Sequence, residues 1–377
     1  MGEKTSHSVI PQNDLENTCL ALLNGEPVKV SESQARPLLA FAQEQGIAPL
    51  LHEQLNRSPP ANGIPQELLT GLQSTAIHEA AAELARRHEL EQVLSAFAKA
   101  SIKPILTKGT PLAYTLYPNP NLRPRCDTDL LIPLADKDRA INLLIQLGYR
   151  FPNTTSGRFV MHQAACTKQP GSGLPIQLDI HWRISNRPSF ARILAYERLI
   201  KNAIAVPGLG PHACTPDNKE ALLYACLHRA GHILEGMGNR LIWLYDIHLL
   251  IGAQTEAGLA DVVEEAGRNA VSALCLDAFE QTRKRFQTRI PETVMHRLRE
   301  DSKKKEITGG YLDQSWQASI LSDLRSLPGL PNKLTLLREH LFPPREYMLR
   351  KYRTDKRLLL PVLYLHRLVS GFRKRLR

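Results

Sequence analysis

The chain has 377 residues, of which 43% are hydrophobic and 23% charged, which is typical of a globular protein large enough for two or three domains. It contains no run of about 18 apolar residues, so the sequence predicts no membrane-spanning helix. The formal net charge of +11 is mainly a C-terminal feature, because residues 345–377 hold eleven Lys or Arg and only two acids. The rest of the chain is nearly neutral.

The first 80 residues have helical patterns. Residues 13–23, 34–45 and 48–55 predict short helices, and a stretch rich in Pro, Gly and Ser follows them. A long helix is predicted over 66–99, where apolar residues recur with three- and four-residue spacing. We therefore predict an N-terminal helical region over 1–80.

The pattern changes after residue 100. Four short apolar segments predict strands, and they are 102–106, 129–132, 159–167 and 174–184. An amphipathic helix is predicted between the second and third of them, over 136–147. The sequence thus predicts an α+β fold with a small mixed sheet, in a core over 81–187. A C-terminal helical region over 188–344 and a basic amphipathic tail over 345–377 complete the predicted organisation.

Asp127-Thr128-Asp129 carries the main chemical signal. Residues two apart on a strand point to the same face, so these two carboxylates would lie side by side and repel unless a cation lies between them. Oxygen ligands of this kind favour Mg²⁺, or Mn²⁺. Asp179 lies within another apolar strand and needs similar compensation. Three carboxylates on two strands suit a two-metal site, although capping, solvation or pairing with an arginine would explain each acid separately.

A phosphate-binding turn is predicted before the acid pair. Lys108-Gly109-Thr110 follows the first predicted strand, and it offers a cation, a residue without a side chain and a hydroxyl. Arg123 could neutralise a triphosphate, and Arg125 is a weaker candidate for the same role. The alternatives are an ordinary strand-to-helix turn and solvated surface arginines.

Several motifs together resemble a poorly characterised bacterial nucleotidyltransferase family, which is related to the DNA polymerase β-like superfamily. The motifs are Lys108-Gly109, Tyr117-Pro118, Arg123, Asp127 to Leu131, Leu147 to Tyr149, and Asp179 to Trp182. Weaker similarity continues through 227–228, 241–246 and 342–347, so it covers roughly residues 80 to 370. The turn departs from the superfamily pattern, because it has Gly-Thr in place of Gly-Ser and a longer gap before the acids.

The resemblance implies a palm-like sheet that binds a nucleoside triphosphate and divalent metal, between helical regions that shape an acceptor site. It implies that Asp127, Asp129 and Asp179 are metal ligands, and that Lys108, Gly109 and Thr110 contact phosphate. The implied reaction moves a nucleotidyl group to an acceptor hydroxyl and releases pyrophosphate. The acceptor is open: a small molecule, a peptide, a protein and RNA all fit. Rival hypotheses are a catalytically silent nucleotide-binding protein and a module that binds RNA or membrane.

Three further features carry weaker predictions. His228 and His232 are four apart on a predicted helix, and we favour packing or a hydrogen bond over a zinc site for them. Asp246 is expected to pair with an arginine such as Arg240. His181 or Trp182 could form part of the site wall, and a purely structural role fits them equally well.

The basic tail and the cysteines bear on partners and location. The tail has Leu365, Val369, Phe372 and Leu376 at helical spacing, which suits an anionic membrane surface, nucleic-acid phosphates or packing on the protein itself. The six scattered cysteines favour reduced thiols in a cytoplasmic protein, with contact at the inner membrane surface if the tail binds lipid.

Overall fold

The computed structural model describes residues 10–58, 63–152, 157–171, 173–304, 306–313 and 315–373, apart from the side chains of 307 and 371–373. The side chain of Phe372 and the end of the basic tail, with Leu376, therefore lie outside the described residues. No helix in these ranges has the length and apolar character needed to cross a bilayer.

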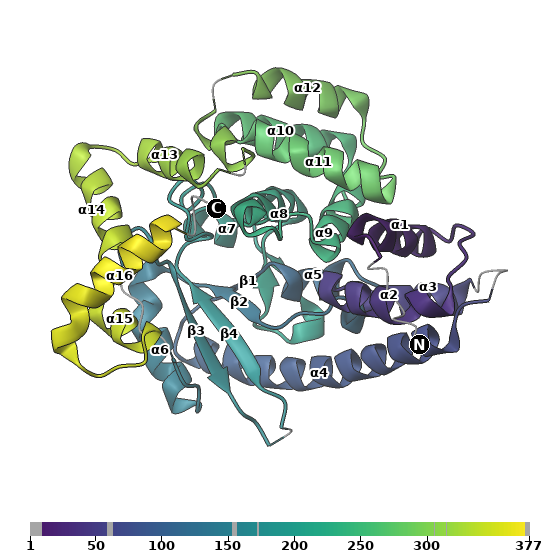
Figure 1. Ribbon diagram of the computed structural model, residues 1–377, viewed down its shortest axis with the longest axis horizontal. Helices are drawn as coiled ribbons and strands as arrows, with labels where there is room; N and C mark the ends of the chain where they lie inside the picture. The colour runs from purple at the N-terminus through teal and green to yellow at the C-terminus, as the bar shows by residue number, and fades with distance from the viewer. Residues whose placement is uncertain are drawn as a thin grey trace, which may run out of the picture.

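The chain begins and ends with helices around a short run of strands (Figure 1). The helices before and within the strand region are α1 Gln12–Leu23, α2 Glu32–Gln45, α3 Ala48–Arg57, α4 Gln66–Lys99, α5 Gly109–Thr115 and α6 Lys137–Gln146. The strands of the main sheet are β1 Ile105–Thr107, β2 Thr128–Leu131, β3 Gln163–Lys168 and β4 Ile176–His181. A two-stranded ribbon is made of β5 Ile204–Ala205 and β6 Cys214–Thr215. The later helices are α7 Tyr196–Lys201, α8 Asn218–Gly231, α9 Leu241–Gly252, α10 Glu256–Arg268, α11 Ser272–Phe286, α12 Glu292–Ser302, α13 Trp316–Ser326, α14 Leu330–Leu341, α15 Arg345–Lys351 and α16 Leu360–Arg373.

The main sheet is small and mixed, which confirms the predicted α+β class. Its strand order is β1-β2-β4-β3, with β2 and β4 parallel and the two outer pairs antiparallel. The parallel pair places Asp129 opposite Asp179, and the first antiparallel pair places Thr107 opposite Asp129. Because side chains alternate along a strand, all three point to one face of the sheet.

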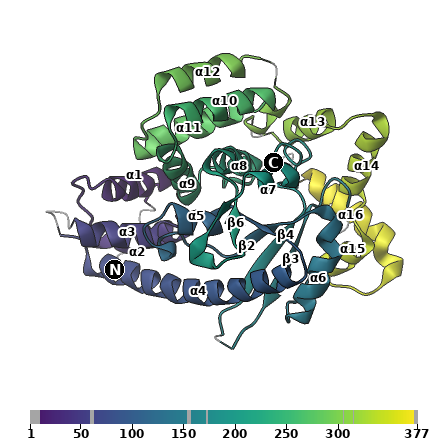
Figure 2. The ribbon, with the colours of Figure 1, turned by 180° about the vertical axis from the view of Figure 1, so that it is seen from behind.

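The opposite face of the sheet packs on α4 and α6, which cover it from behind (Figure 2). Leu106, Leu130, Leu178 and Ile180 meet a row of α4 side chains in one apolar cluster. That row is Leu90, Val93, Leu94 and Phe97, and all four are buried. Its three- and four-residue spacing is the pattern from which the helix was predicted, and burial of this stripe holds the sheet in place.

The face of the sheet that carries Asp129 and Asp179 lies toward the C-terminal helices. Ile105 and Leu131 join a large cluster built by α8, α10, α11 and α12. The N-terminal helices form a separate cluster with α9, in which Leu241, Ile242 and Leu244 are buried. Helix α4 contributes to two clusters, since Leu68 packs with the N-terminal helices and Phe97 with the sheet. One unbroken helix thus crosses the predicted boundary at residue 80, and the four-region division stays a prediction.

The third strand starts later than predicted, for a visible reason. The backbone amides of Arg158, Phe159 and Val160 all donate to the carboxylate of Glu339 in α14, at 2.7 to 3.2 Å. These amides are therefore not available for a strand ladder, and β3 begins at Gln163. An acid nearly two hundred residues away in the chain decides this boundary.

Removing the ring of Phe97 should destabilise the protein. Phe97 is fully buried between α4 and the sheet, so Phe97→Ala should lower the free energy of unfolding by about 3–5 kcal/mol. Leu84 on the same helix is 69% exposed, so the matched change Leu84→Ala should cost less than about 0.5 kcal/mol. Chemical denaturation of the two variants measures both values, and equal losses would contradict the assigned core.

Candidate active site

A cavity of about 650 Å³ lies between the carboxylate face of the sheet and helices α8 and α9. Lys108, Asp127, Asp129, Asp179 and His181 line it from the sheet side. The opposite side is formed mainly by α8, α9 and the segment between them. The structure therefore brings the three predicted acids and the predicted lysine into one enclosed space.

The turn between β1 and α5 aims Lys108 at the acids. Lys108 has φ +58° and ψ −136°, a backbone conformation that residues other than glycine rarely adopt. Its ammonium lies 2.5 Å from the Oδ1 atom of Asp129. Such backbone strain costs on the order of 1–3 kcal/mol and persists where the surroundings enforce it, often at functional sites.

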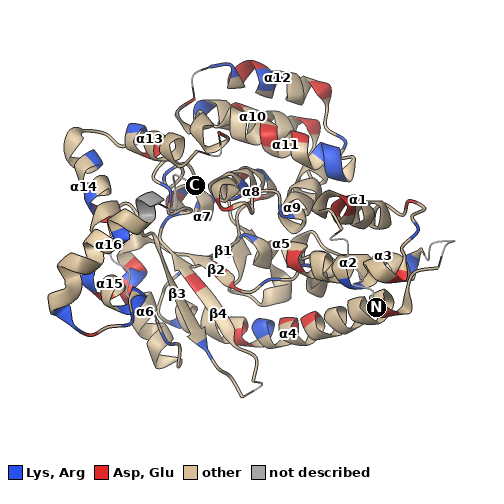
Figure 3. Cartoon of the chain, in the orientation of Figure 1, with Lys and Arg blue, Asp and Glu red and all other residues tan. Residues whose placement is uncertain are grey.

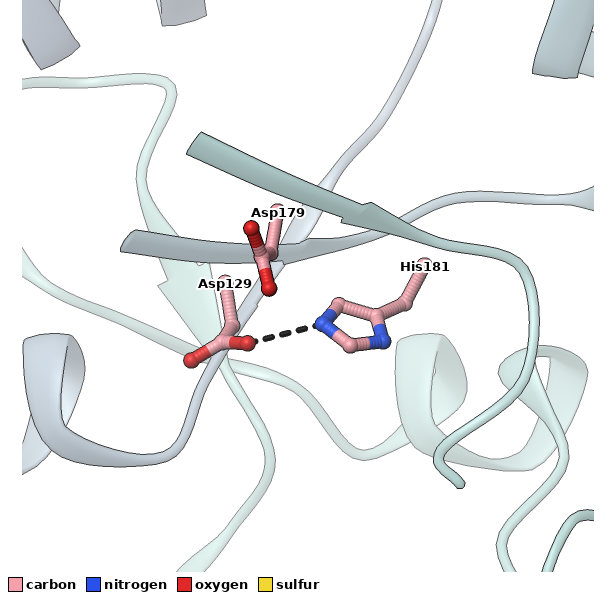
Figure 4. A group of neighbouring side chains, drawn as sticks. All are labelled: Asp129, Asp179 and His181. Carbon is pink, nitrogen blue, oxygen red and sulfur yellow. Dashed lines mark hydrogen bonds and ion pairs between the residues drawn. The ribbon is translucent and has the colours of Figure 1, made fainter. Parts of the chain in front are cut away.

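Asp129, Asp179 and His181 form a compact group of potential metal ligands (Figure 4). One ligand atom from each lies within 4.8 Å of the others, and all three residues are buried. The Nε2 atom of His181 is 2.7 Å from Asp129 Oδ1. His181 is two residues after Asp179 on β4, so it shares the same face. Sequence analysis assigned His181 only to the site wall, although this spacing already indicated that it points toward the acids.

The three acids differ in electrostatic environment. Burial and the neighbouring charge of Asp129 raise the pKa of Asp127 to about 6. Burial and Asp129 also raise the pKa of Asp179 above its usual range. For Asp129 burial acts in the same direction, but Lys108 and His181 outweigh it and hold its pKa below the usual range. Asp129 is thus ionised, whereas the other two carboxylates lack compensating charge.

His181 is a neutral ring with one unused nitrogen. Burial and the charge of Lys108 lower its pKa, more than Asp129 raises it. A neutral ring beside an ionised carboxylate carries its proton on the facing atom, so Nε2 donates to Asp129. Within the described residues, Nδ1 is buried without a hydrogen-bond partner.

This donor set fits a divalent cation. Three carboxylates line the cavity, and the ammonium of Lys108 contacts one of them, Asp129. Burial first, and then the negative charge of Asp129, raise the pKa values of Asp127 and Asp179, so a bound cation would favour their ionised forms. Buried carboxylate oxygens and a neutral imidazole are established ligands for divalent metals.

Arg123 lies at the cavity wall, but its guanidinium is already paired. Its Nε and Nη2 atoms donate to the carboxylate of Asp246 at 2.6 to 3.1 Å, and Nη1 donates to the carbonyl of Pro124 at 2.7 Å. The Tyr117 hydroxyl donates to the same carboxylate at 2.7 Å. Asp246 therefore pairs with an arginine, as predicted, but with Arg123 in place of Arg240.

Gly109 is needed because Arg123 lies against it. A Cβ atom at Gly109 would be 2.8 Å from the Arg123 Cζ atom, closer than real side chains come. Thr110 lies behind the turn: its side chain is 1% exposed, and its hydroxyl is 3.4 Å from that of Thr128. Arg125 is also buried, and its Nη2 donates to Glu83 of α4 at 2.8 Å. Of the predicted phosphate contacts, Lys108, Gly109 and Arg123 line the cavity, whereas Thr110 is buried against Thr128 and does not line it.

The wall opposite the acids is aromatic and carries Arg240. The rings of His228, His232 and Trp243 pack together with centroids 4.7 to 5.2 Å apart, as the packing prediction for the two histidines implied. Burial and Lys108 keep the pKa of His228 well below its usual value, so this ring is neutral. Arg240 donates through Nε to the carbonyl of Glu44 at 3.0 Å, and no acid pairs with it in the described part of the chain. Burial and the nearby charge of Arg123 lower its pKa.

Comparison with known proteins agrees with this geometry. Residues 31–287 match a family described as an uncharacterised nucleotidyltransferase. Because the match covers more than half of the chain, the chain belongs to this family, which confirms the resemblance seen in the motifs. The matched region ends before residues 342–347, where weaker similarity was expected. A comparison with curated proteins gave no match.

Neutralising two acids of the cluster should change stability in opposite directions. The folded pKa of Asp127, about 6, exceeds the value of about 4 expected in the unfolded chain, so its charge costs stability as the pH rises through this interval. Asp127→Asn should therefore raise the free energy of unfolding by roughly 1 kcal/mol at about pH 8 in a chelating buffer. This gain should disappear below about pH 4, where Asp127 is protonated in both states.

Asp129→Asn is the matched control, and it should destabilise the protein. The depressed pKa of Asp129 means that its charge stabilises the fold above about pH 4, and its loss would leave Lys108 unpaired, at a cost of about 3 kcal/mol. Denaturation curves of both variants across this pH range test the assignment. Two changes of the same sign would contradict the charge distribution described here.

Proposed function

We propose that this member of the nucleotidyltransferase family transfers a nucleotidyl group from a nucleoside triphosphate to an acceptor hydroxyl and releases pyrophosphate. The observation that carries the proposal is the parallel pairing of β2 and β4, which places Asp129 beside Asp179 in a cavity that Lys108 also enters. The cavity, of about 650 Å³, is of a size that accommodates a nucleotide-sized ligand.

Asp127, Asp129 and Asp179 are the proposed ligands for Mg²⁺ or Mn²⁺. When bound, such an ion neutralises charge on the phosphates and stabilises the transition state of phosphoryl-type transfer. His181 has a positioning role in this scheme, because its Nε2–H bond to Asp129 fixes the orientation of that carboxylate. The charge balance of the site would come from these residues together with Lys108.

The chemical step follows from the same residues. The acceptor oxygen attacks the α-phosphorus, a new P–O bond forms, and the bond to the oxygen that bridges toward the β-phosphorus breaks. Pyrophosphate leaves with that oxygen. Asp179 accepts the proton of the acceptor hydroxyl, a role that its raised pKa suits because a stronger base is a better proton acceptor near neutral pH.

Lys108, Gly109 and Arg240 are the proposed triphosphate contacts. Lys108 supplies a charge at the acid cluster, and Gly109 lets the turn pack against the Arg123 guanidinium at the cavity wall. Thr110 supports this turn through Thr128. Arg240 lacks an acidic partner in the described residues, so a phosphate would supply the missing counter-charge. We propose that Arg123 contributes mainly by holding the turn, since Asp246 already occupies its guanidinium.

The aromatic wall is the proposed place for the base or a planar acceptor. Trp243 lines the cavity beside His228 and His232, and aromatic rings bind nucleobases by stacking without strong sequence preference. The described cysteines are free thiols, and triphosphates are cytoplasmic metabolites, which together favour a cytoplasmic reaction.

Nucleotide binding is the first test. Isothermal titration of ATP, GTP, CTP and UTP with Mg²⁺ should give metal-dependent binding of at least one triphosphate. This binding should be lost in Asp127→Ala/Asp129→Ala. Asp179→Asn should keep binding and slow turnover by about 10²–10⁴-fold, since it removes the proposed base. Asp138→Asn changes an exposed acid on α6 and should affect neither quantity.

Three outcomes would decide against the proposal or refine it. No triphosphate binding by folded protein would contradict it. Full turnover in Asp127→Asn would contradict the proposed ligands. Metal-dependent binding without turnover on hydroxyl acceptors of every class would support the silent nucleotide-binding alternative.

Arg240 and Arg123 should respond differently to the same substitution. Arg240→Gln should weaken triphosphate binding by roughly tenfold, the loss of one charge-assisted contact, with little change in unfolding. Arg123→Gln should instead lower the free energy of unfolding by about 3–5 kcal/mol, because Asp246 would remain buried and unpaired. Arg268→Gln, at an exposed arginine on α10, is the control for both measurements. If Arg123→Gln weakened triphosphate binding and Arg240→Gln lowered the free energy of unfolding instead, Arg123 would be the triphosphate contact.

A further inference from the structure

The outward face of α16 is apolar, which is unusual for a surface helix. Leu358, which is 94% exposed, begins a row that continues with Val362 at 62%, Leu365 at 63% and Val369 at 45%. Leu358 lies in the 3₁₀ turn Arg357–Leu359 that leads into α16, and the three- and four-residue spacing places Val362, Leu365 and Val369 on one side of the helix. Leu359 and Pro361 widen the row, and we call these six residues the aliphatic ridge.

The inner side of α16 fixes the direction of the ridge. The Tyr364 hydroxyl donates to the carbonyl of Pro343 at 2.6 Å, and Arg367 donates to the carbonyl of His340 at 2.7 Å. The ring of Phe342 packs against Tyr364 with a centroid distance of 5.8 Å. Because the polar side chains of the helix hold it to α14, the ridge is the side left for solvent.

Positive charge lies at the start of the ridge. Residues 345–377 carry eleven Lys or Arg and two acids, and Figure 3 shows basic residues on α15 and on the segment that joins it to α16. Arg353, Lys356 and Arg357 are exposed immediately before Leu358. Exposed basic residues and exposed aliphatic residues are therefore adjacent at the start of the ridge.

We propose that the aliphatic ridge and its basic border bind the surface of an anionic lipid bilayer. Aliphatic side chains on one helix face insert at the boundary of headgroups and acyl chains, while neighbouring Lys and Arg side chains reach the phosphates. Each basic residue near an anionic surface strengthens binding by roughly fivefold, and the effect decays within a Debye length. The protein would lie on the membrane without crossing it.

Two other occupants match the surface less well. A second copy of the chain would bring two strongly basic segments together across a symmetric contact, and their repulsion opposes association. Single-stranded RNA is bound by basic grooves with aromatic platforms, whereas the ridge is aliphatic. An anionic bilayer complements both the charge and the apolar side chains.

The helix that carries the ridge is connected to the cavity through α14. Glu339 of α14 binds the backbone amides of 158–160, and both Val160 and the adjacent His340 line the cavity. Lipid binding by α16 would therefore hold the catalytic cavity near the bilayer, which favours acceptors that are presented at the membrane surface.

Sedimentation with vesicles tests the proposal independently of catalysis. The 377-residue chain should sediment with vesicles of phosphatidylcholine and phosphatidylglycerol but not with phosphatidylcholine alone, and added salt should weaken the binding. Val362→Asp/Leu365→Asp should weaken it by about tenfold or more, because two charges replace inserted side chains. Lys356→Gln/Arg357→Gln should weaken it by roughly fivefold for each charge removed.

The control variant is Ile77→Asp/Leu84→Asp on α4, where the residues are 63% and 69% exposed, like those replaced on the ridge. It should sediment as the unchanged protein does, and thermal unfolding should show that all variants are folded. Equal binding by the ridge variant, equal binding to both kinds of vesicle, or no binding would overturn the proposal. Self-association or RNA binding that the ridge substitutions abolish, without vesicle binding, would assign the ridge to those partners instead.

Discussion

The parallel pairing of β2 with β4 is the constraint on which the rest of the site depends. It places Asp129 opposite Asp179 on the same face of the sheet, and the alternation of side chains along β4 then adds His181. A shift of register by one residue would turn these acids into the apolar cluster formed with α4 and α6. The register is secured from behind, where Leu130, Leu178 and Ile180 are buried against α4. The apolar face of the sheet thus determines the geometry of the charged face.

The three carboxylates repel one another, and individual neighbouring side chains determine how far this repulsion is offset at each of them. Lys108 and His181 both contact Asp129, and this acid is held ionised. Asp127 and Asp179 have no comparable cation beside them, and their pKa values rise. A cation that bound to these carboxylates would offset their repulsion and would therefore stabilise the folded protein.

Sequence reasoning succeeded where a signal is local. The helix over 66–99 matched α4 because its apolar spacing extends over many turns. The acid pair was only partly anticipated, because Asp129 lies in β2 whereas Asp127 precedes the strand, and His181 in place of Asp127 completes the compact group with Asp129 and Asp179. It failed where a partner is distant in the chain. Nothing near Arg123 indicates that Asp246, 123 residues away, will occupy its guanidinium. Likewise, the late start of β3 depends on Glu339, which no pattern around residue 159 contains.

The buried ion pair of Arg123 and Asp246 connects the sheet side of the cavity to α9 on the opposite side. It joins the segment before β2 to α9, so the turn at Gly109, the acid cluster and the aromatic wall with Trp243 are held relative to one another by one ion pair. A buried pair of this kind adds little net stability compared with apolar packing, but it strongly penalises arrangements in which either partner is exposed alone. Moving α9 away from the segment before β2 would separate Arg123 from Asp246 and leave one of these charges unpaired, so the ion pair favours the arrangement in which the two cavity walls face each other.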